Sequence, residues 1–339
     1  MNILIVQTAF IGDIILSTPV ISGVKKLHPT ARITLMTTPV GAGLFCHDPR
    51  IDEIIVFDKR GGEKGLAGLF RKAGELRRKK FDRAYSLHRS HRTSVLLFLS
   101  RIPWRTGFAD AKLGFLYTHG EKRNMEGHAV FRNMAVLLGE ADLDYFDGEM
   151  ELHAPKKEGL SRETRELTRS ISPGNFVVLA PGSAWKTKQW HPQGYAELAS
   201  HLRDKGMKVV LIGGPGDVKV CGQIAQGLDV LDLSGKIPLT ETLYFVKHAA
   251  VLVCNDSMAL HMGSAFKTPT VCVFCATSPA FGFGPWRNPH ALVVEDEDLE
   301  CKPCRRHGSM KCPQGDGACM RVPSSRVIRA CGQLLGWDD

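Results

Sequence analysis

The sequence predicts an α/β protein with two doubly wound domains, each a parallel sheet covered by helices on both faces. Three observations lead to this prediction. The chain has 339 residues, which is long for a single hydrophobic core. Short runs rich in Val, Ile and Leu alternate with amphipathic stretches, without the strict alternation of a half-exposed sheet. The second half restarts the pattern of the first, as expected for two βαβ domains.

In the first half, strands are expected at 2–8, 32–38, 53–58 and 83–88. One helix is expected between the first two strands, with Asp13 near its start. The parallel order then places the loops that follow these strands at one edge of the sheet.

A polar segment, 154–175, separates the halves and carries Pro-Gly near its end. We expect an N-terminal domain at 1–155, a linker at 156–175 that includes a helix, and a C-terminal domain at 176–339.

In the second half, a helix is expected at 195–206 and stops at Gly206. A C-terminal helix is also expected. The expected strand segments, some with the loop that follows, are 175–182, 207–217, 230–235, 249–256 and 268–277.

The composition is that of a folded protein, with 43% hydrophobic and 23% charged residues. No apolar run approaches the roughly 18–20 residues that span a bilayer, and the N-terminal apolar run lacks the basic start of a signal peptide. We therefore expect a cytoplasmic protein whose ten cysteines are reduced thiols or metal ligands.

The net charge of +9 is concentrated in one segment. Residues 59–123 hold 17 Lys and Arg against 5 Asp and Glu, so an anionic partner is expected. The basic stretch 71–80 fits a solvated helix face, whereas the His and Arg residues of 88–94 follow a strand end and suggest binding.

Four polar loops follow the ends of expected strands. The first, QTAFIGD at 7–13, carries Gly12, which permits a close backbone turn, and Asp13 at a helix start. Asp13 is either a functional carboxylate or a helix cap, and the motif alone does not separate these readings.

The second loop lies within 180–199 and is a candidate diphosphate cradle. Gly182 and Ser183 offer backbone and hydroxyl donors, and Lys188 adds a cation, as does a second lysine two residues earlier. The Walker pattern is absent.

The same loop holds Trp185 and Trp190, which are expected to wall off a pocket. The alternative is a solvated lysine-rich loop with Trp190 packed inward.

The third loop, IGGPGD at 212–217, ends in Asp217, which either accepts hydrogen bonds from a nucleoside or simply closes a turn. The pattern GxGxxG is absent here, which disfavours an NAD-linked oxidoreductase.

The fourth loop, CNDSMALHMGSAF at 254–266, places Asp256 and Ser257 before an apolar helix, and His261 one turn after Ser257. A helix start behind Asp-Ser suits an anion. The alternatives are a capping aspartate and a core histidine.

Together these loops resemble those of the heptosyltransferases of glycosyltransferase family 9. The resemblance also includes FIGDIILSTP at the N-terminus, IPWRTGF at 102–108, GHAVFRN at 127–133 and SPAFGFGPW at 278–286. It implies the GT-B architecture, in which two Rossmann-like domains face each other across a cleft.

The resemblance implies roles by position. Asp13 matches the proposed general base. The implied donor-binding residues are Gly182, Ser183, Lys188, Asp217, Ile237, Asp256, Ser257, Met258 and His261. Met258 departs from the family pattern, which usually has Gly, and its side chain would crowd an approaching phosphate or sugar.

The implied reaction is inverting transfer of heptose from ADP-L-glycero-D-manno-heptose to the Kdo- and phosphate-bearing lipid A core, without a divalent metal. An anionic acceptor gives the basic segment a role, and the same surface is expected to contact the inner leaflet of the cytoplasmic membrane. The candidate acceptor residues are Gly12, Arg89, Arg92, Arg105, Arg123, His128 and Arg132.

Cys301, Cys304, Cys312 and Cys319 give the spacing C-x2-C-x7-C-x6-C. One C-x2-C pair with two looser cysteines suits a structural zinc site, whereas an iron–sulfur cluster is a weaker alternative. Reduced thiols that hold a loop by packing account for the pattern equally well.

Two alternatives to the heptosyltransferase reading stay open. One is a family 9 transferase with another sugar or acceptor position. The other is a nucleic-acid-binding protein that uses the basic segment and a four-cysteine zinc module, although no recognition-helix or RNP-like pattern supports it. Nucleic acid is therefore not an expected partner.

Overall fold

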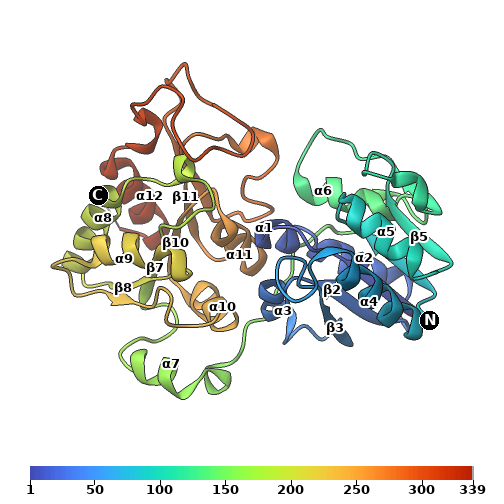
Figure 1. Ribbon diagram of the computed structural model, residues 1–339. Coiled ribbons are helices and arrows are strands. Elements are labelled where there is room, and N and C mark those ends of the chain that lie inside the picture. Colours follow the sequence, from blue (N-terminus) through green and yellow to red (C-terminus); the bar gives the residue numbers. More distant parts are fainter. Residues whose placement is uncertain (338–339) are drawn as a thin grey trace. The chain divides into compact units, whose positions relative to one another are not determined.

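The computed structural model describes residues 1–337 and divides the chain into two compact units (Figure 1). The first is Met1–His153, and the second begins at Ala154. Each unit contains a six-stranded parallel sheet with helices, so the predicted fold class is confirmed. No helix among the described residues combines the length and the apolar character that crossing a bilayer requires.

The sheet of the first unit has the order β3-β2-β1-β4-β5-β6. Ile3 pairs with Ile33 on one side and with Arg83 on the other, so β1 is central. Its apolar residues are fully buried, as expected for a strand covered on both faces. The strands are β1 (Asn2–Val6), β2 (Arg32–Thr37), β3 (Glu53–Val56), β4 (Arg83–Ser86), β5 (Trp104–Phe108) and β6 (His119–Glu121).

The single helix expected after β1 is instead two helices. The chain breaks at Leu16 and Ser17, and Pro19 lies in the first turn of the second helix, where its missing N–H costs no hydrogen bond. The helices of this unit are α1 (Ile11–Ile15), α2 (Thr18–Leu27), α3 (Pro39–Phe45), α4 (Gly65–Arg78), α5 (His91–Leu99) and α6 (Ala129–Met134).

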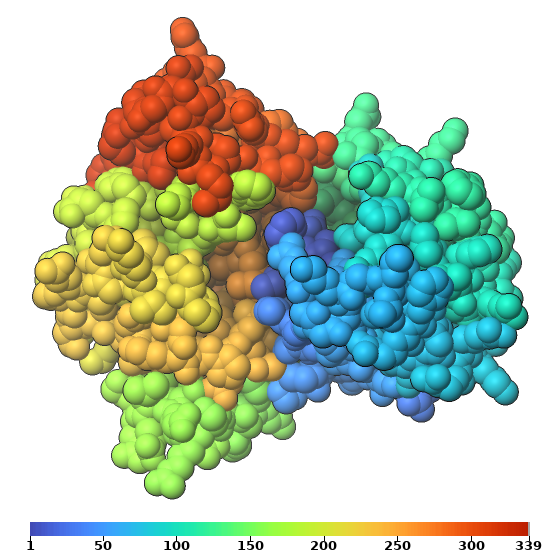
Figure 2. All heavy atoms as spheres, in the orientation of Figure 1, coloured from blue at the N-terminus to red at the C-terminus, as the bar shows by residue number. Residues whose placement is uncertain are grey.

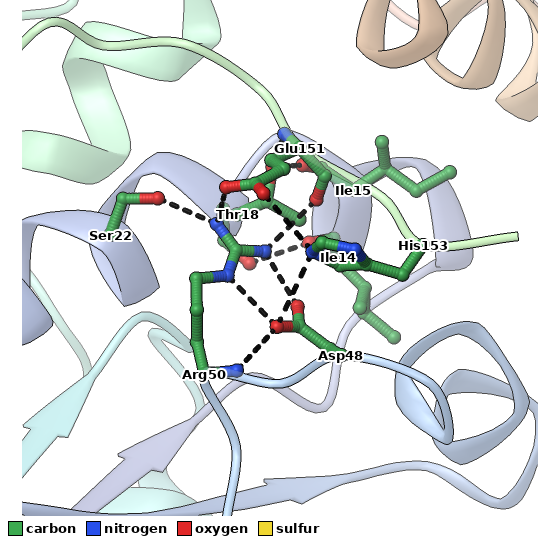
Figure 3. A network of polar contacts seen from close by, with 9 residues as sticks. Ile14, Ile15, Thr18, Ser22, Asp48, Arg50, Glu151 and His153 are labelled. Atoms are coloured by element: carbon green, nitrogen blue, oxygen red, sulfur yellow. Dashed lines mark hydrogen bonds and ion pairs between the residues drawn. The ribbon is translucent and has the colours of Figure 1, made fainter.

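A polar network fastens the end of the first unit to its body (Figure 3). The Arg50 guanidinium donates to Asp48 at 2.5 Å, to Glu151 at 2.7 Å and to the Ser22 hydroxyl at 2.6 Å. The His153 imidazole lies 3.1 Å from Glu151. Because the Asp48 carboxylate is fully buried, Arg50 supplies its compensating charge.

The sheet of the second unit has the order β12-β11-β10-β7-β8-β9. Its strands are β7 (Phe176–Ala180), β8 (Lys208–Leu211), β9 (Leu231–Asp232), β10 (Val251–Asn255), β11 (Thr270–Phe274) and β12 (Ala291–Glu295). All registered pairs are parallel, so the loops after β7, β8, β10 and β11 lie at one edge.

The helices of the second unit are α7 (Arg162–Leu167), α8 (Pro192–Asp204), α9 (Val218–Ala225), α10 (Leu239–His248), α11 (Met258–Phe266) and α12 (Ser324–Leu335). The expected helix at 195–206 begins earlier, because His191 caps the N–H of Gly194 and a proline follows at the first helical position. Helix α7, in the expected linker, belongs to this unit, and the Ser161 N–H donates to Glu241 at 2.8 Å.

Candidate active site

The second unit brings together three of the expected donor residues at the carboxyl ends of β7 and β10. The Lys188 ammonium lies 2.7 Å from the Asp256 carboxylate, and the Thr277 hydroxyl donates to the same oxygen at 2.6 Å. The Ser183 hydroxyl donates to the main-chain carbonyl of Asp256 at 3.3 Å. Lys188 and Asp256 are both buried, so this is an ion pair held in place by the fold.

Asn255, at the end of β10, positions the loop that carries Lys188. Its side-chain amide donates to the Pro181 carbonyl at 2.7 Å and accepts from the main-chain N–H of Trp190 at 2.9 Å. One fully buried amide thus holds both ends of the loop, which explains how a loop rather than a helix can place a lysine reproducibly.

The C-terminal part of the chain crosses the same loop. Thr187 donates its N–H and hydroxyl to the Ser309 carbonyl at 3.1 and 3.0 Å, and its hydroxyl accepts from the Ser309 N–H at 2.8 Å. Gly308 packs against the Lys188 side chain so closely that a Cβ there would lie 3.0 Å from Lys188 Cγ. Figure 2 shows this orange-red segment on the surface of the second unit, against the yellow-green atoms of earlier residues. We call residues 301–319 the strap.

The strap also brings His307 toward the ion pair. Burial, together with the nearby charges of Lys188 and Arg306, lowers the pKa of His307. This imidazole is therefore neutral near pH 7.

Asp217 closes a turn next to Gly182. Its carboxylate accepts from the Gly214 N–H at 2.9 Å, and a Cβ on Gly182 would lie 2.4 Å from the carboxylate oxygen. Glycine at 182 is therefore required for packing against Asp217. Ile237 is half-buried in the loop between β9 and α10.

Ser257 is the N-cap residue of α11, and Met258 is the first residue of that helix. Asp256 precedes the cap, so the reading of Asp256 as an ordinary N-cap is wrong, and its carboxylate pairs with Lys188 instead. His261 is buried within α11.

Trp190 does not line a pocket, and this expectation is wrong. Its ring is buried in the core of the second unit, and its indole N–H donates to the Val322 carbonyl at 2.8 Å. A tryptophan at this position packs inward because the core of the second unit surrounds its ring and Val322, just before α12, supplies an acceptor for its indole N–H.

In the first unit, Asp13 is the third residue of α1, and Gly12 precedes it. The N-cap residue is Phe10, so the alternative that Asp13 caps this helix is wrong. Asp13 is half-exposed at the carboxyl edge of the sheet, where ligands bind in open α/β sheets.

A cluster of polar groups joins three loops at the same edge. The Lys59 ammonium donates to the carbonyl and the hydroxyl of Thr8, each at 2.9 Å, and the Thr8 hydroxyl lies 3.3 Å from His88 Nδ1. The same nitrogen lies 3.0 Å from the Thr93 hydroxyl. Burial, and to a smaller extent the charges of Arg92 and Arg60, lower the pKa of Lys59 to about 8. Burial, and to a smaller extent the charge of Lys59, lower the pKa of His88 to about 4.

The candidate acceptor residues have different partners. Arg92 donates to the Gly65 carbonyl at 3.0 Å, whereas exposed Arg89 lies 3.2 Å from Asp110. Arg132 is buried and donates to the Gly127 carbonyl at 2.7 Å. His128 caps α6, and Arg123 lies 5.0 Å from the Phe108 ring.

Arg105 lies elsewhere. It is the second residue of β5 and donates to the Leu116 carbonyl at 3.2 Å, near the amino edge of the sheet. Residues that begin a strand lie at the opposite edge from those that follow one, so the structure does not group Arg105 with the other acceptor candidates.

The four cysteines of the strap are free thiols. Burial and the neighbouring thiols of the group raise the pKa of Cys304, and raise that of Cys319 to about 11. Within residues 1–337, no three His, Cys, Asp or Glu side chains are arranged to hold a metal ion. The zinc site at Cys301, Cys304, Cys312 and Cys319 therefore stays a prediction.

Comparison with known proteins identifies the family. The model of glycosyltransferase family 9 (heptosyltransferase) matches residues 69–313, more than half of the chain. The chain belongs to this family. As a family 9 protein it is a glycosyltransferase, which disfavours the nucleic-acid-binding alternative.

Individual relatives agree with the family 9 assignment. Lipopolysaccharide heptosyltransferase 3 of Escherichia coli is 28% identical over 291 residues, 82% of this chain and 84% of the relative. Lipopolysaccharide heptosyltransferase 2 of E. coli K12 is 27% identical over 311 residues, 83% and 84% of the two chains. A solved family 9 glycosyltransferase from Veillonella parvula superposes with a TM-score of 0.84 at 24% identity, covering 98% of this chain and 97% of that one. The fold is that of the GT-B glycosyltransferases.

The sequence reading of this family 9 enzyme missed several residues of both clusters. Lys59 directly follows the expected strand 53–58, so the rule that selected the other loops points to it as well, and His88 lies in the segment 88–94 that the sequence had already indicated. Asn255 ends β10 and Thr277 follows β11, which are positions of the same kind. The contact of Ser309 with Thr187 had no signal in the sequence.

Proposed function

We propose that this family 9 enzyme transfers heptose from ADP-L-glycero-D-manno-heptose to the inner core of lipopolysaccharide, with inversion at the anomeric carbon. Relatives named as lipopolysaccharide heptosyltransferases support the donor and the acceptor class. The observation that carries the proposal is the buried Lys188–Asp256 pair beside Ser183 at the carboxyl edge of the second sheet.

The second unit would hold the donor and stabilise its leaving group. When the glycosidic bond to the diphosphate breaks, negative charge develops on ADP. The ammonium has three donors, of which Asp256 takes one, so Lys188 can donate to a phosphate oxygen while it stays oriented by the carboxylate. The free N–H groups at the start of α11 would add to this stabilisation.

Asp13 would act as the general base. It takes the proton of the acceptor hydroxyl as that oxygen bonds to the anomeric carbon from the face opposite the diphosphate. One C–O bond forms while the other breaks, and ADP leaves with its electron pair. A positioned base of this kind typically contributes about 10²–10⁴-fold in rate.

The acceptor is proposed to bind at the cluster around Lys59. Lys59, Arg60 and Arg92 gather positive charge beside the loop that carries Asp13, and burial followed by these two arginines lowers the pKa of Lys59. Carboxylate or phosphate groups of a Kdo- and phosphate-bearing core would neutralise this charge. We also propose that the enzyme works at the cytoplasmic face of the inner membrane, where such a lipid-linked acceptor would be presented.

The decisive experiment offers the purified enzyme ADP-heptose and other nucleotide sugars with defined core acceptors, and follows ADP release and product mass. The donor panel also tests the alternative of another sugar, which Met258 in place of the usual Gly keeps open.

Asp13→Asn should lower turnover by about 10²–10⁴-fold and leave ADP affinity unchanged, because every donor residue named above lies in the second unit. Asp142→Asn, at an exposed aspartate of the same unit, is the matched control. Normal turnover by Asp13→Asn would rule out the assigned base.

Two proposals concern metals. Transfer should continue in excess EDTA, since Lys188 and α11 supply the positive charge that a divalent ion would otherwise provide.

The second proposal concerns zinc. Metal analysis should find one zinc per chain if the strap cysteines bind it. Cys304→Ser should lose this zinc, while Cys46→Ser, at an exposed cysteine outside the strap, should keep it. If the purified protein is folded and contains no zinc, packing of reduced thiols would explain the four strap cysteines instead.

A further inference from the structure

An open groove of about 660 Å³ lies on the outer face of α4 and α5 in the first unit. Phe70, Gly74 and Arg77 of α4 line one side, and Phe98 and Arg101, at and just beyond the end of α5, line the other. The two helices lie side by side in Figure 1. Because α4 ends shortly before β4 begins, and α5 shortly before β5, the groove lies toward the amino edge of the sheet, away from Asp13 and Lys59.

Large apolar side chains project from this face into solvent. The exposed fractions are 72% for Leu66, 59% for Phe70, 49% for Phe98 and 80% for Phe115. Leu66 and Phe70 are four residues apart on α4 and share one side of it. Phe115 lies in the 3₁₀ turn η1 (Gly114–Leu116), which packs beside α5. Single exposed apolar residues are common, but a group of them on one face marks an interaction surface.

The charged side chains that line the groove are all arginines. Residues 64–105 contain twelve Lys and Arg against two acids, and four of these cations, Lys72, Lys79, Arg83 and Arg89, are paired with acids. No carboxylate lines the groove. For Arg77 and Arg101, the structure records no side-chain hydrogen bond or ion pair within residues 1–337. Two uncompensated guanidinium groups therefore lie beside two exposed phenylalanine rings.

We propose that this face, which we call the α4–α5 face, docks the enzyme on an anionic bilayer surface. Phenyl rings that enter the boundary of the acyl chains, with arginines that reach the lipid phosphates, match the chemistry of such a surface. The inference rests on the proposed function, because a lipid-anchored acceptor requires an enzyme that works at a membrane. The groove lies toward the amino edge of the first sheet, whereas Leu66 lies at the start of α4, toward the carboxyl edge where the acceptor sugar is proposed to bind.

The test is co-sedimentation of the full chain with vesicles of phosphatidylcholine alone or of phosphatidylcholine with phosphatidylglycerol. Wild-type protein should bind the anionic vesicles, and added salt should release it. R77Q/R101Q should weaken partition by about fivefold for each arginine removed. F70S/F115S should weaken it at least as much. L167S and R162Q, at exposed positions of the second unit, are the matched controls and should bind as wild type does.

Equal binding of wild-type protein to both kinds of vesicle, or unchanged binding by both double variants, would overturn the proposal. A dimer seen by size-exclusion chromatography and abolished by F70S/F115S would show instead that a second copy covers the face. Turnover of a delipidated, water-soluble acceptor keeps the two proposals apart. Vesicle binding without turnover would count against the transferase assignment alone, whereas normal turnover without vesicle binding would defeat only the docking surface.

Discussion

In the proposed mechanism, Lys188 combines a chemical role with a structural one, because the carboxylate that orients its ammonium is itself buried. Removing the lysine leaves Asp256 without a compensating charge, which typically costs about 3–5 kcal/mol in a buried pair. Donor binding and folding stability should therefore change together at this residue.

Lys188→Gln should lower the affinity for ADP and also lower the free energy of unfolding, the latter by about 3–5 kcal/mol. Calorimetric titration and chemical denaturation measure the two effects. Lys186→Gln is the matched control, since Lys186 is exposed in the same loop and should change neither quantity. Equal loss of ADP binding in both variants would show that general positive charge, rather than the placed ammonium, binds the diphosphate.

Lys59 should make acceptor use depend on pH. Its lowered pKa of about 8 means that the ammonium is present below pH 8 and is lost as the pH rises through that value. We expect kcat/KM for the anionic acceptor to fall above pH 8 because this parameter reports the free enzyme.

In Lys59→Arg, the side chain stays charged and the decline should move to higher pH. Lys64→Arg, at an exposed lysine nearby, should leave the profile of the wild type unchanged. A decline at the same pH in Lys59→Arg would mean that another group titrates.

Among the elements, the short helix α1 shows how the chain presents a carboxylate. Because α1 ends at Ile15 and α2 begins as a separate helix at Thr18, Asp13 lies in a short helix of its own at the carboxyl edge of the sheet. The Asn133 side chain, at α6, donates to the Leu16 carbonyl at 3.1 Å and so supports the break. The sequence contains the cause, Pro19, but the uninterrupted apolar pattern favoured a single helix.

Among the polar contacts of the first unit, substitutions in the Arg50 network should lower the free energy of unfolding the most. Arg50→Met removes the cation beside the fully buried Asp48 and should lower the free energy of unfolding by about 3–5 kcal/mol. Arg32→Met is the control, because the pair of Arg32 with Glu53 is exposed and 3.7 Å apart, so its loss should cost no more than about 1 kcal/mol. Similar losses in both variants, measured by denaturant titration, would contradict the structural role of Arg50.

For the whole molecule, the sequence was sufficient to predict the two parallel sheets and most of the polar loops at their carboxyl edges. Apolar runs buried on both faces identify strands such as β1 and β10, and the residues that follow them lie at one edge by geometry. This reasoning placed Ser183, Lys188 and Asp256 correctly near one another.

The same reasoning failed where the deciding contact is remote. Nothing near Trp190 in the chain indicates that the Val322 carbonyl accepts a hydrogen bond from the Trp190 indole N–H. The sequence therefore could not decide whether the Trp190 ring faces the core or a pocket. Arg105 was misplaced because β5, with the sequence WRTGF, lacks the Val, Ile and Leu residues that mark most of the other strands, and without its start the edge on which Arg105 lies is undetermined.

The bond between Thr187 and Ser309 has a consequence for how the enzyme matures. The two residues are 122 positions apart, so a ribosome must complete almost the entire chain before the strap can add its hold to that of Asn255 on the loop that carries Lys188. A nascent or prematurely terminated polypeptide that ends before the strap would retain every strand of both sheets and yet lack this second hold. In the proposed mechanism, full catalytic competence would then arrive only at the close of synthesis.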